Sequence, residues 1–93
     1  MIYQSQNVTQ VSTVLAYEKL EIVYRFANNY GVKVTSFIDK SDVDISVLTF
    51  NGEDLMDYAV TTETEISAQP QRTISGDVLF QTLLQIEELS GSV

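Results

Sequence analysis

Carboxylates are the side chains of this sequence that could do chemistry, and they are concentrated between residues 39 and 65. The whole chain has 93 residues, thirteen of them acidic and five basic, with a net charge of −8. The stretch 39–65 holds one cation, Lys40, and eight of the acids: Asp39, Asp42, Asp44, Glu53, Asp54, Asp57, Glu63 and Glu65. Such a stretch could bind a cation, perform acid–base catalysis or recognise a basic partner.

Cation binding is the first of these uses. Asp42, Asp44, Ser46 and Glu53 match positions 1, 3, 5 and 12 of an EF-hand calcium loop. The sixth position of that loop needs glycine for its sharp turn, and here it is Val47. Apolar residues also alternate through the segment as in a strand. We therefore predict a strand with acidic residues on its outer face and no metal site.

Acid–base catalysis needs a shielded pocket that shifts the pKa of a carboxyl group, and an open sheet face offers none. The chain has no His and no Cys, so it lacks the commonest general base, the commonest transition-metal ligand and a thiol nucleophile. It also has no Gly-rich phosphate loop. We predict no catalytic residue and no cofactor, so the protein is not expected to be an enzyme.

Composition limits the remaining classes. An apolar content of 44 % in 93 residues predicts one folded domain, 1–93, with one modest core. Without cysteine there is no disulfide framework, and no apolar run is long enough to span a membrane. The N-terminus lacks the features of a signal peptide, so we expect a cytoplasmic location. Five cations against thirteen acids repel phosphate, which argues against direct nucleic-acid binding.

The elements that must position the carboxylates follow from hydrophobic periodicity. Residues 1–10 are polar and predict an extended arm. Apolar residues at spacings of three, four and seven predict a helix over 12–30. Strands are expected over 32–38, 43–50 and 53–66, and a second helix over 75–89 with Ser75 as its N-cap. The predicted fold class is α+β: a helix, a three-stranded antiparallel meander and a helix, arranged in two layers.

The predicted strand register comes from two turns. Asn51-Gly52 favours a type I′ turn, because both residues tolerate positive φ. That turn pairs Val47 with Met56 and Ile45 with Tyr58, and a four-residue turn at 39–42 pairs Val34 with Val47. The inner face of the meander then consists of apolar residues: Val43, Ile45, Val47, Met56, Tyr58 and Val60. A slip of one residue would move this set to the wrong face.

The outer face of the same hairpin combines carboxylates with apolar residues near its tip. We predict that it binds a protein with a basic, partly apolar groove, because charge steers the encounter and desolvated apolar groups anchor it. The predicted partner-binding residues are Asp42, Asp44, Leu48, Phe50, Glu53, Asp54, Leu55, Asp57 and Glu63. The alternative is a solvated face that keeps the protein soluble and guards against edge aggregation.

In size, acidity and order of elements, the whole chain resembles small phage-type inhibitors of the anti-CRISPR and DNA-mimic class. The resemblance implies that an acidic strand-and-loop surface occupies the nucleic-acid-binding surface of a nuclease or CRISPR effector. It also implies a contact set of Asp42, Asp44, Glu53, Asp54 and Asp57. Immunity proteins that neutralise basic toxins share this profile. A self-associating structural or adaptor subunit is a third alternative, with a homodimer through Tyr17, Leu20 and Tyr24 or through the second helix.

Overall fold

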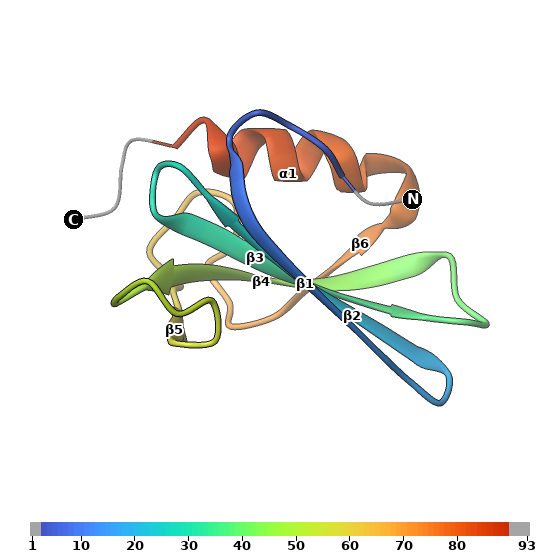
Figure 1. Ribbon diagram of the computed structural model, residues 1–93. Helices are drawn as coiled ribbons and strands as arrows, with labels where there is room; N and C mark the ends of the chain where they lie inside the picture. Colours follow the sequence, from blue (N-terminus) through green and yellow to red (C-terminus); the bar gives the residue numbers. More distant parts are fainter. Residues whose placement is uncertain (1–2, 90–93) are drawn as a thin grey trace.

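The computed structural model describes residues 3–89, which form six strands and one α-helix (Figure 1). The strands are β1 (Val8–Ala16), β2 (Lys19–Phe26), β3 (Tyr30–Phe37), β4 (Asp42–Phe50), β5 (Tyr58–Val60) and β6 (Arg72–Ser75). A short 3-10 turn, η1 (Gly76–Val78), leads into the helix α1 (Leu79–Glu87). Met1 and Ile2 of the predicted arm lie outside the described residues. The chain from Val8 onward belongs to β1 rather than to an arm.

All six strands belong to one antiparallel sheet with the order β1-β2-β3-β4-β5. The sixth strand, β6, also pairs with β4. β3 lies along one side of β4, while β6 and β5 share its other side, at residues 42–45 and 48–50. The chain between these two short strands, 61–71, leaves the sheet and returns to the same edge. One edge of the sheet is therefore built from two short strands, and the other is the long strand β1.

The predicted helix over 12–30 is wrong, because this segment forms the end of β1, the whole of β2 and the following turn. Residues four apart lie on the same face of a strand, whose side chains repeat every two residues. They also lie close together on a helix, which repeats every 3.6 residues, so this spacing does not distinguish the two. Ile22, Tyr24 and Phe26 alternate and are buried together on one face. The turn at Tyr17 and Glu18 contains no Gly or Asn, although Tyr17 has φ 55°. The fold is thus a six-stranded sheet with one helix, not a meander between two helices.

The β3–β4 pairing preserves the predicted faces although its register differs. Val34 lies opposite Ile45 and Val32 opposite Val47, whereas the prediction placed Val34 opposite Val47. The shift is two residues, which leaves every side chain on its predicted face. Val43, Ile45 and Val47 are buried at 8 %, 0 % and 0 % exposure.

The β4–β5 pairing does not preserve the predicted faces. Phe50 pairs with Tyr58 rather than with Glu53, so the chain between the two strands is the loop 51–57 and not a two-residue turn. No glycine among residues 3–89 has positive φ, which excludes the type I′ turn at Gly52. The register of this pairing differs from the predicted one by five residues. Because five is an odd number, each side chain of β5 lies on the face of the sheet opposite to the predicted one. Val60 of β5 is 45 % exposed, and Met56, which lies in the loop rather than in a strand, is 60 % exposed.

A C-terminal helix is present, as predicted, but the predicted span 75–89 contains the 3-10 turn η1 followed by the shorter helix α1. The Ser75 hydroxyl accepts a hydrogen bond from the backbone N–H of Asp77, 3.3 Å away, and so caps η1. α1 then runs for nine residues and buries Leu83 and Ile86 against the sheet. Within residues 3–89 no helix is long and apolar enough to cross a membrane.

Each face of the sheet carries a cluster of buried side chains. α1 covers one face, as Figure 1 shows, and the larger cluster lies beneath it. Its buried members are Ile22, Tyr24, Phe26, Val32, Val34, Val43, Ile45, Val47, Ile66, Ile74, Leu83 and Ile86. The smaller cluster on the opposite face consists of Val23, Leu48 and Phe50, with Leu55 and Tyr58 packed against it. Through Leu55, this second cluster holds the loop 51–57 against the sheet, and the loop carries four of the nine predicted site residues.

Candidate functional site: the acidic end of the molecule

The loop 51–57 has a defined shape because its own polar groups hold it. The backbone N–H of Asp57 donates to the carbonyl of Asp54 at 3.1 Å, and the N–H of Asn51 donates to the carbonyl of Asp57 at 3.3 Å. The Asp54 carboxylate accepts a hydrogen bond from the N–H of Met56 at 2.9 Å. This is the local bond by which Asp favours turns over strands. It explains why Asp54 starts a turn where the sequence predicts a strand.

The apolar members of the predicted site point inward, which corrects the expectation of an exposed apolar tip. Leu48 and Phe50 are only 0 % and 5 % exposed, and Leu55 packs against them half-buried. The Phe50 ring meets Tyr58 edge-on with ring centroids 6.2 Å apart. These residues stabilise the loop and are not available as anchors for a partner.

The same cluster holds Arg25 beside the loop. Its guanidinium carbon lies 4.8 Å above the centre of the Phe50 ring, and its side chain donates to Asn29 at 2.9 Å. Gly31 makes room for this stack, because a Cβ there would lie 2.2 Å from the Tyr24 carbonyl oxygen and 2.5 Å from the Phe50 ring. Arg25 and Glu53 line one shallow depression of about 420 Å³. A cation thus lies at the border of the carboxylates.

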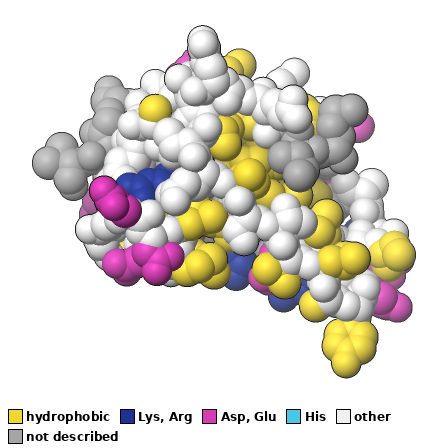
Figure 2. All heavy atoms as spheres, in the orientation of Figure 1, with side chains coloured by type: hydrophobic (Ala, Val, Ile, Leu, Met, Phe, Trp, Pro, Cys, Tyr) yellow, Lys and Arg dark blue, Asp and Glu magenta, His cyan; other side chains and the backbone are white. Residues whose placement is uncertain are grey.

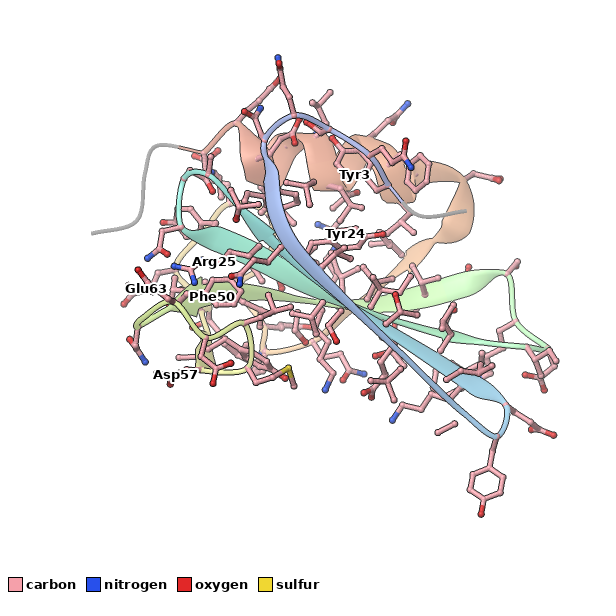
Figure 3. The ribbon with its side chains drawn as sticks, in the orientation of Figure 1. Tyr3, Tyr24, Arg25, Phe50, Asp57 and Glu63 are labelled. Carbon is pink, nitrogen blue, oxygen red and sulfur yellow. The ribbon has the colours of Figure 1, made fainter. Side chains whose placement is uncertain are left out.

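Four of the predicted carboxylates come together at one end of the molecule, which we call the acidic end: Glu53, Asp54, Asp57 and Glu63. All four are exposed. Figure 2 shows Asp and Glu side chains gathered at the lower left, and Figure 3 shows Asp57 and Glu63 at that same end. Asp57 precedes β5 and Glu63 follows it, so the short strand fixes the spacing of the two loops.

Asp42 and Asp44 are separated from the acidic end. They lie at the start of β4, and at about 3.3 Å per residue Asp44 is about 20 Å along the strand from Phe50, after which the loop 51–57 begins. Asp44 accepts a hydrogen bond of 2.6 Å from the hydroxyl of Thr73 on β6. The predicted contact set therefore divides into two groups along β4. The strand conformation of Asp42–Phe50 also confirms the preference for a strand over a calcium loop. Among residues 3–89 no three His, Cys, Asp or Glu side chains lie close enough to hold a metal ion.

Among residues 3–89, the only carboxylate that forms ion pairs is that of Glu21, which lies away from the acidic end. Glu21 lies 2.8 Å from the Lys19 ammonium and 3.8 Å from that of Lys33. The hydrogen bond from Lys19 holds the pKa of the Glu21 carboxyl below its ordinary value, against the opposing effect of partial burial. The carboxylates of the acidic end form no ion pair with the described part of the chain. Their charge is directed at solvent.

The three residues named as a possible homodimer surface, Tyr17, Leu20 and Tyr24, lie in different environments. Tyr24 is 2 % exposed, with its hydroxyl accepting a hydrogen bond from the N–H of Tyr3, so it cannot contribute to a surface. Leu20 is half-buried, and Tyr17 is fully exposed at the β1–β2 turn. The sequence prediction missed another apolar feature at this place. Leu15 and Ile38 are 75 % and 80 % exposed and line a groove of about 220 Å³ with Tyr17. The two β-hairpin tips that form it could be found only after β1 and β2 were known to be strands.

Comparison with protein-family models, curated proteins and solved structures found no match to this chain. Geometry and charge therefore carry the functional argument.

Proposed function

We propose that the protein acts by binding, as an inhibitor that presents its acidic end to a basic, nucleic-acid-binding surface of a partner such as a nuclease or CRISPR effector. The observation that carries the proposal is the group of exposed carboxylates Glu53, Asp54, Asp57 and Glu63, which have no cationic partner among residues 3–89. Such a group attracts cationic surfaces over a Debye length of about 8 Å at physiological salt.

The rigidity of this surface supports recognition over mere solubility. The loop 51–57 is closed by three internal hydrogen bonds and anchored by Leu55 on the second cluster. A loop whose backbone is already ordered loses less entropy on binding than a flexible one, which favours a defined partner. The loop after β5 is shaped in the same way, because Glu63 N–H donates to the Thr61 hydroxyl and Ser67 N–H to that of Thr64.

The placement of the carboxylates also weakens the edge-protection alternative. Charged residues protect a sheet when they lie on an unpaired edge strand. Here the acidic end lies beside β5, which is a three-residue edge strand. The longer edge strand β1 has no charged residue at all. Edge protection alone therefore does not account for this distribution of charge, because the longer edge is left uncharged.

A paired charge reversal tests the proposal. Glu53→Lys with Asp57→Lys reverses the acidic end, and Glu18→Lys with Asp39→Lys is the matched control at the hairpin tips; each pair raises the net charge from −8 to −4. The probes are a guide-loaded CRISPR effector and a purified nuclease toxin, each assayed for DNA binding and cleavage in the presence of the protein. We expect the wild-type protein to compete with DNA for one of them, increasingly as salt is lowered.

The acidic-end variant should lose that inhibition by about tenfold or more, while the control stays within about twofold of wild type. Inhibition of the toxin alone would favour the immunity-protein alternative. Equal loss in both variants would mean that only net charge matters, and undiminished inhibition by the acidic-end variant would exclude this surface. All variants are checked by circular dichroism for wild-type folding.

A further inference from the structure

We call the outer edge of β1 the open edge of the sheet. Among residues 3–89 no strand pairs with it, and this nine-residue strand is longer than β5 and β6, the two short strands that form the opposite edge. In Figure 1, β1 crosses in front of the other strands. An open edge presents unpaired backbone N–H and C=O groups to any strand that can reach them.

The hairpin register identifies those groups. Ala16 lies opposite Lys19 across the turn formed by Tyr17 and Glu18. In a hairpin with a two-residue turn, the pair that flanks the turn exchanges both backbone hydrogen bonds, and the pattern alternates from there. Ala16, Val14 and Ser12 therefore bond toward β2. The N–H and C=O groups of Val11, Thr13 and Leu15 point outward, away from the sheet.

The composition of β1 gives this edge none of the usual chemical protection. Natural edge strands carry Lys, Pro or inward charges that prevent further pairing. Residues 1–17 contain no Asp, Glu, Lys, Arg or Pro, and they form the longest uncharged run in a chain of net charge −8. A bulge between Val8 and Gln10 disturbs only the start of the strand. The regular part, 10–16, is free to pair.

We propose that β1 pairs antiparallel with β1 of a second copy of this chain, about a twofold axis at Thr13. In this register Thr13 faces Thr13 of the other copy, and Val11 faces Leu15 in both directions. All three residues have outward-pointing backbone groups, so the hydrogen bonds between the copies are complete over 11–15. Val11 and Leu15 are 45 % and 75 % exposed and lie on the same face, so pairing covers apolar surface as well.

Charge selects a second copy over a strand of a different protein. β1 offers no charged group that could recognise a foreign strand, and two uncharged strands meet without repulsion. The acidic end lies beyond β4, three strands away at about 4.8 Å per strand, and its Glu53, which lines one depression with Thr9 and Gln10 of β1, lies outside the paired segment 11–15. A strand pair of this length is small, in the range of transient interfaces below about 1,200 Å². The dimer should therefore depend on concentration.

Sedimentation velocity and single-cysteine cross-linking test the proposal. The chain has no cysteine, so Thr13→Cys introduces one thiol per copy at the axis. The two Cα atoms would lie about 5.5 Å apart, within disulfide range. In Ser12→Cys the thiols lie more than about 7 Å apart, because residue 12 faces residue 14 in this register. We expect mild oxidation to give a covalent dimer with Thr13→Cys at least about tenfold faster than with Ser12→Cys or with Thr62→Cys in the loop after β5.

Thr13→Lys provides a second test that does not depend on oxidation. It places two like charges opposite each other at the axis, while Thr62→Lys adds the same charge at an exposed position away from β1. Wild type and Thr62→Lys should show a monomer–dimer equilibrium up to about 500 µM, and Thr13→Lys should remain monomeric.

A wild-type protein that is monomeric throughout this range overturns the proposal. So does a dimer that survives Thr13→Lys, which would place self-association elsewhere, for example on α1, where Phe80 and Leu84 are exposed. If Thr13→Lys instead abolishes inhibition of a nuclease by a monomeric protein, the edge binds a foreign strand and the second copy is excluded.

Discussion

The two edges of the sheet differ in both cover and charge. One edge, which we call the closed edge, consists of the short strands β5 and β6 and is bordered by the loops of the acidic end. The open edge is the long strand β1, which is uncharged. The chain thus places these carboxylates beside two short edge strands and leaves the long edge strand without charge. In the two proposals above, the charged side binds by electrostatic attraction and the uncharged edge by backbone pairing.

The closed edge is stabilised by burial, whereas the open edge is not. β6 contributes Ile74, which is 7 % exposed, and the chain between β5 and β6 contributes Ile66, which is 8 % exposed. Both belong to the cluster beneath α1. The apolar side chains of β1 are much more exposed, for example Leu15 at 75 %. The closed edge is therefore stabilised mainly by buried side chains, and β1 mainly by its backbone hydrogen bonds with β2.

The largest expected effect follows from this difference in burial. Ile74→Ala should lower the free energy of unfolding by about 3 kcal/mol, because it removes buried methylenes and leaves a cavity. Leu15→Ala removes as many carbons from the open edge and should cost no more than about 0.5 kcal/mol. Urea unfolding at low micromolar concentration, where copies stay apart, measures both. Similar losses for the two variants would show that the edges are not stabilised differently.

A smaller effect is expected at Asn28, in the turn between β2 and β3. Its amide nitrogen donates to the carbonyls of Ile86, Glu87 and Leu89 at 2.9–3.2 Å, which ties the end of α1 to the half of the sheet that contains β1. Asn28→Asp loses these donors and brings a negative charge to the negative end of the helix. We expect a loss of about 2 kcal/mol.

Asn51→Asp is the matched control for this substitution, because it makes the same change in the exposed loop 51–57. Its cost should stay within about 0.5 kcal/mol. Thermal unfolding compares the two variants. If Asn28→Asp is as stable as Asn51→Asp, packing alone stabilises the end of α1. The hydrogen bonds of Asn28 then do not stabilise the attachment of α1 to the half of the sheet that contains β1.

The parts of the fold that could be predicted from sequence depend on local signals. Ser75 and the apolar run behind it predicted α1, and the alternation in β4 predicted which of its residues are buried. The segment 12–30 could not be assigned in this way, because its apolar spacing fits both a helix and a strand. Its turn also uses Tyr17 at positive φ, where glycine or asparagine is the usual signal.

The candidate site could be predicted in its charges but not in its apolar residues. Glu53, Asp54 and Asp57 are exposed as the sequence indicates. The burial of Leu48 and Phe50 depends on the loop 51–57 folding onto the sheet and on Arg25 and Gly31 from strands far away in the chain. A two-residue turn at Asn51-Gly52 would have left these side chains without a cover. Contacts of this kind have no local signature.

The smallest expected effect concerns Tyr3, which precedes the open strand and packs edge-on against Tyr24, Phe26 and Phe80. Burial and the neighbouring Glu87 carboxylate raise the pKa of Tyr3 from 10 to about 12. Because the pKa is higher in the folded protein, the contribution of this hydroxyl to stability is complete below pH 10 and is lost as the pH rises toward about 12.

Tyr3→Phe keeps the ring and removes the hydroxyl, so its stability should fall less steeply than that of the wild type between pH 10 and about 12. Tyr17→Phe removes a hydroxyl that is fully exposed and should reproduce the wild-type curve. Urea unfolding across this window measures the difference between the three proteins. If the Tyr3→Phe curve coincides with that of the wild type, the chain before β1 is held only by its aromatic contacts.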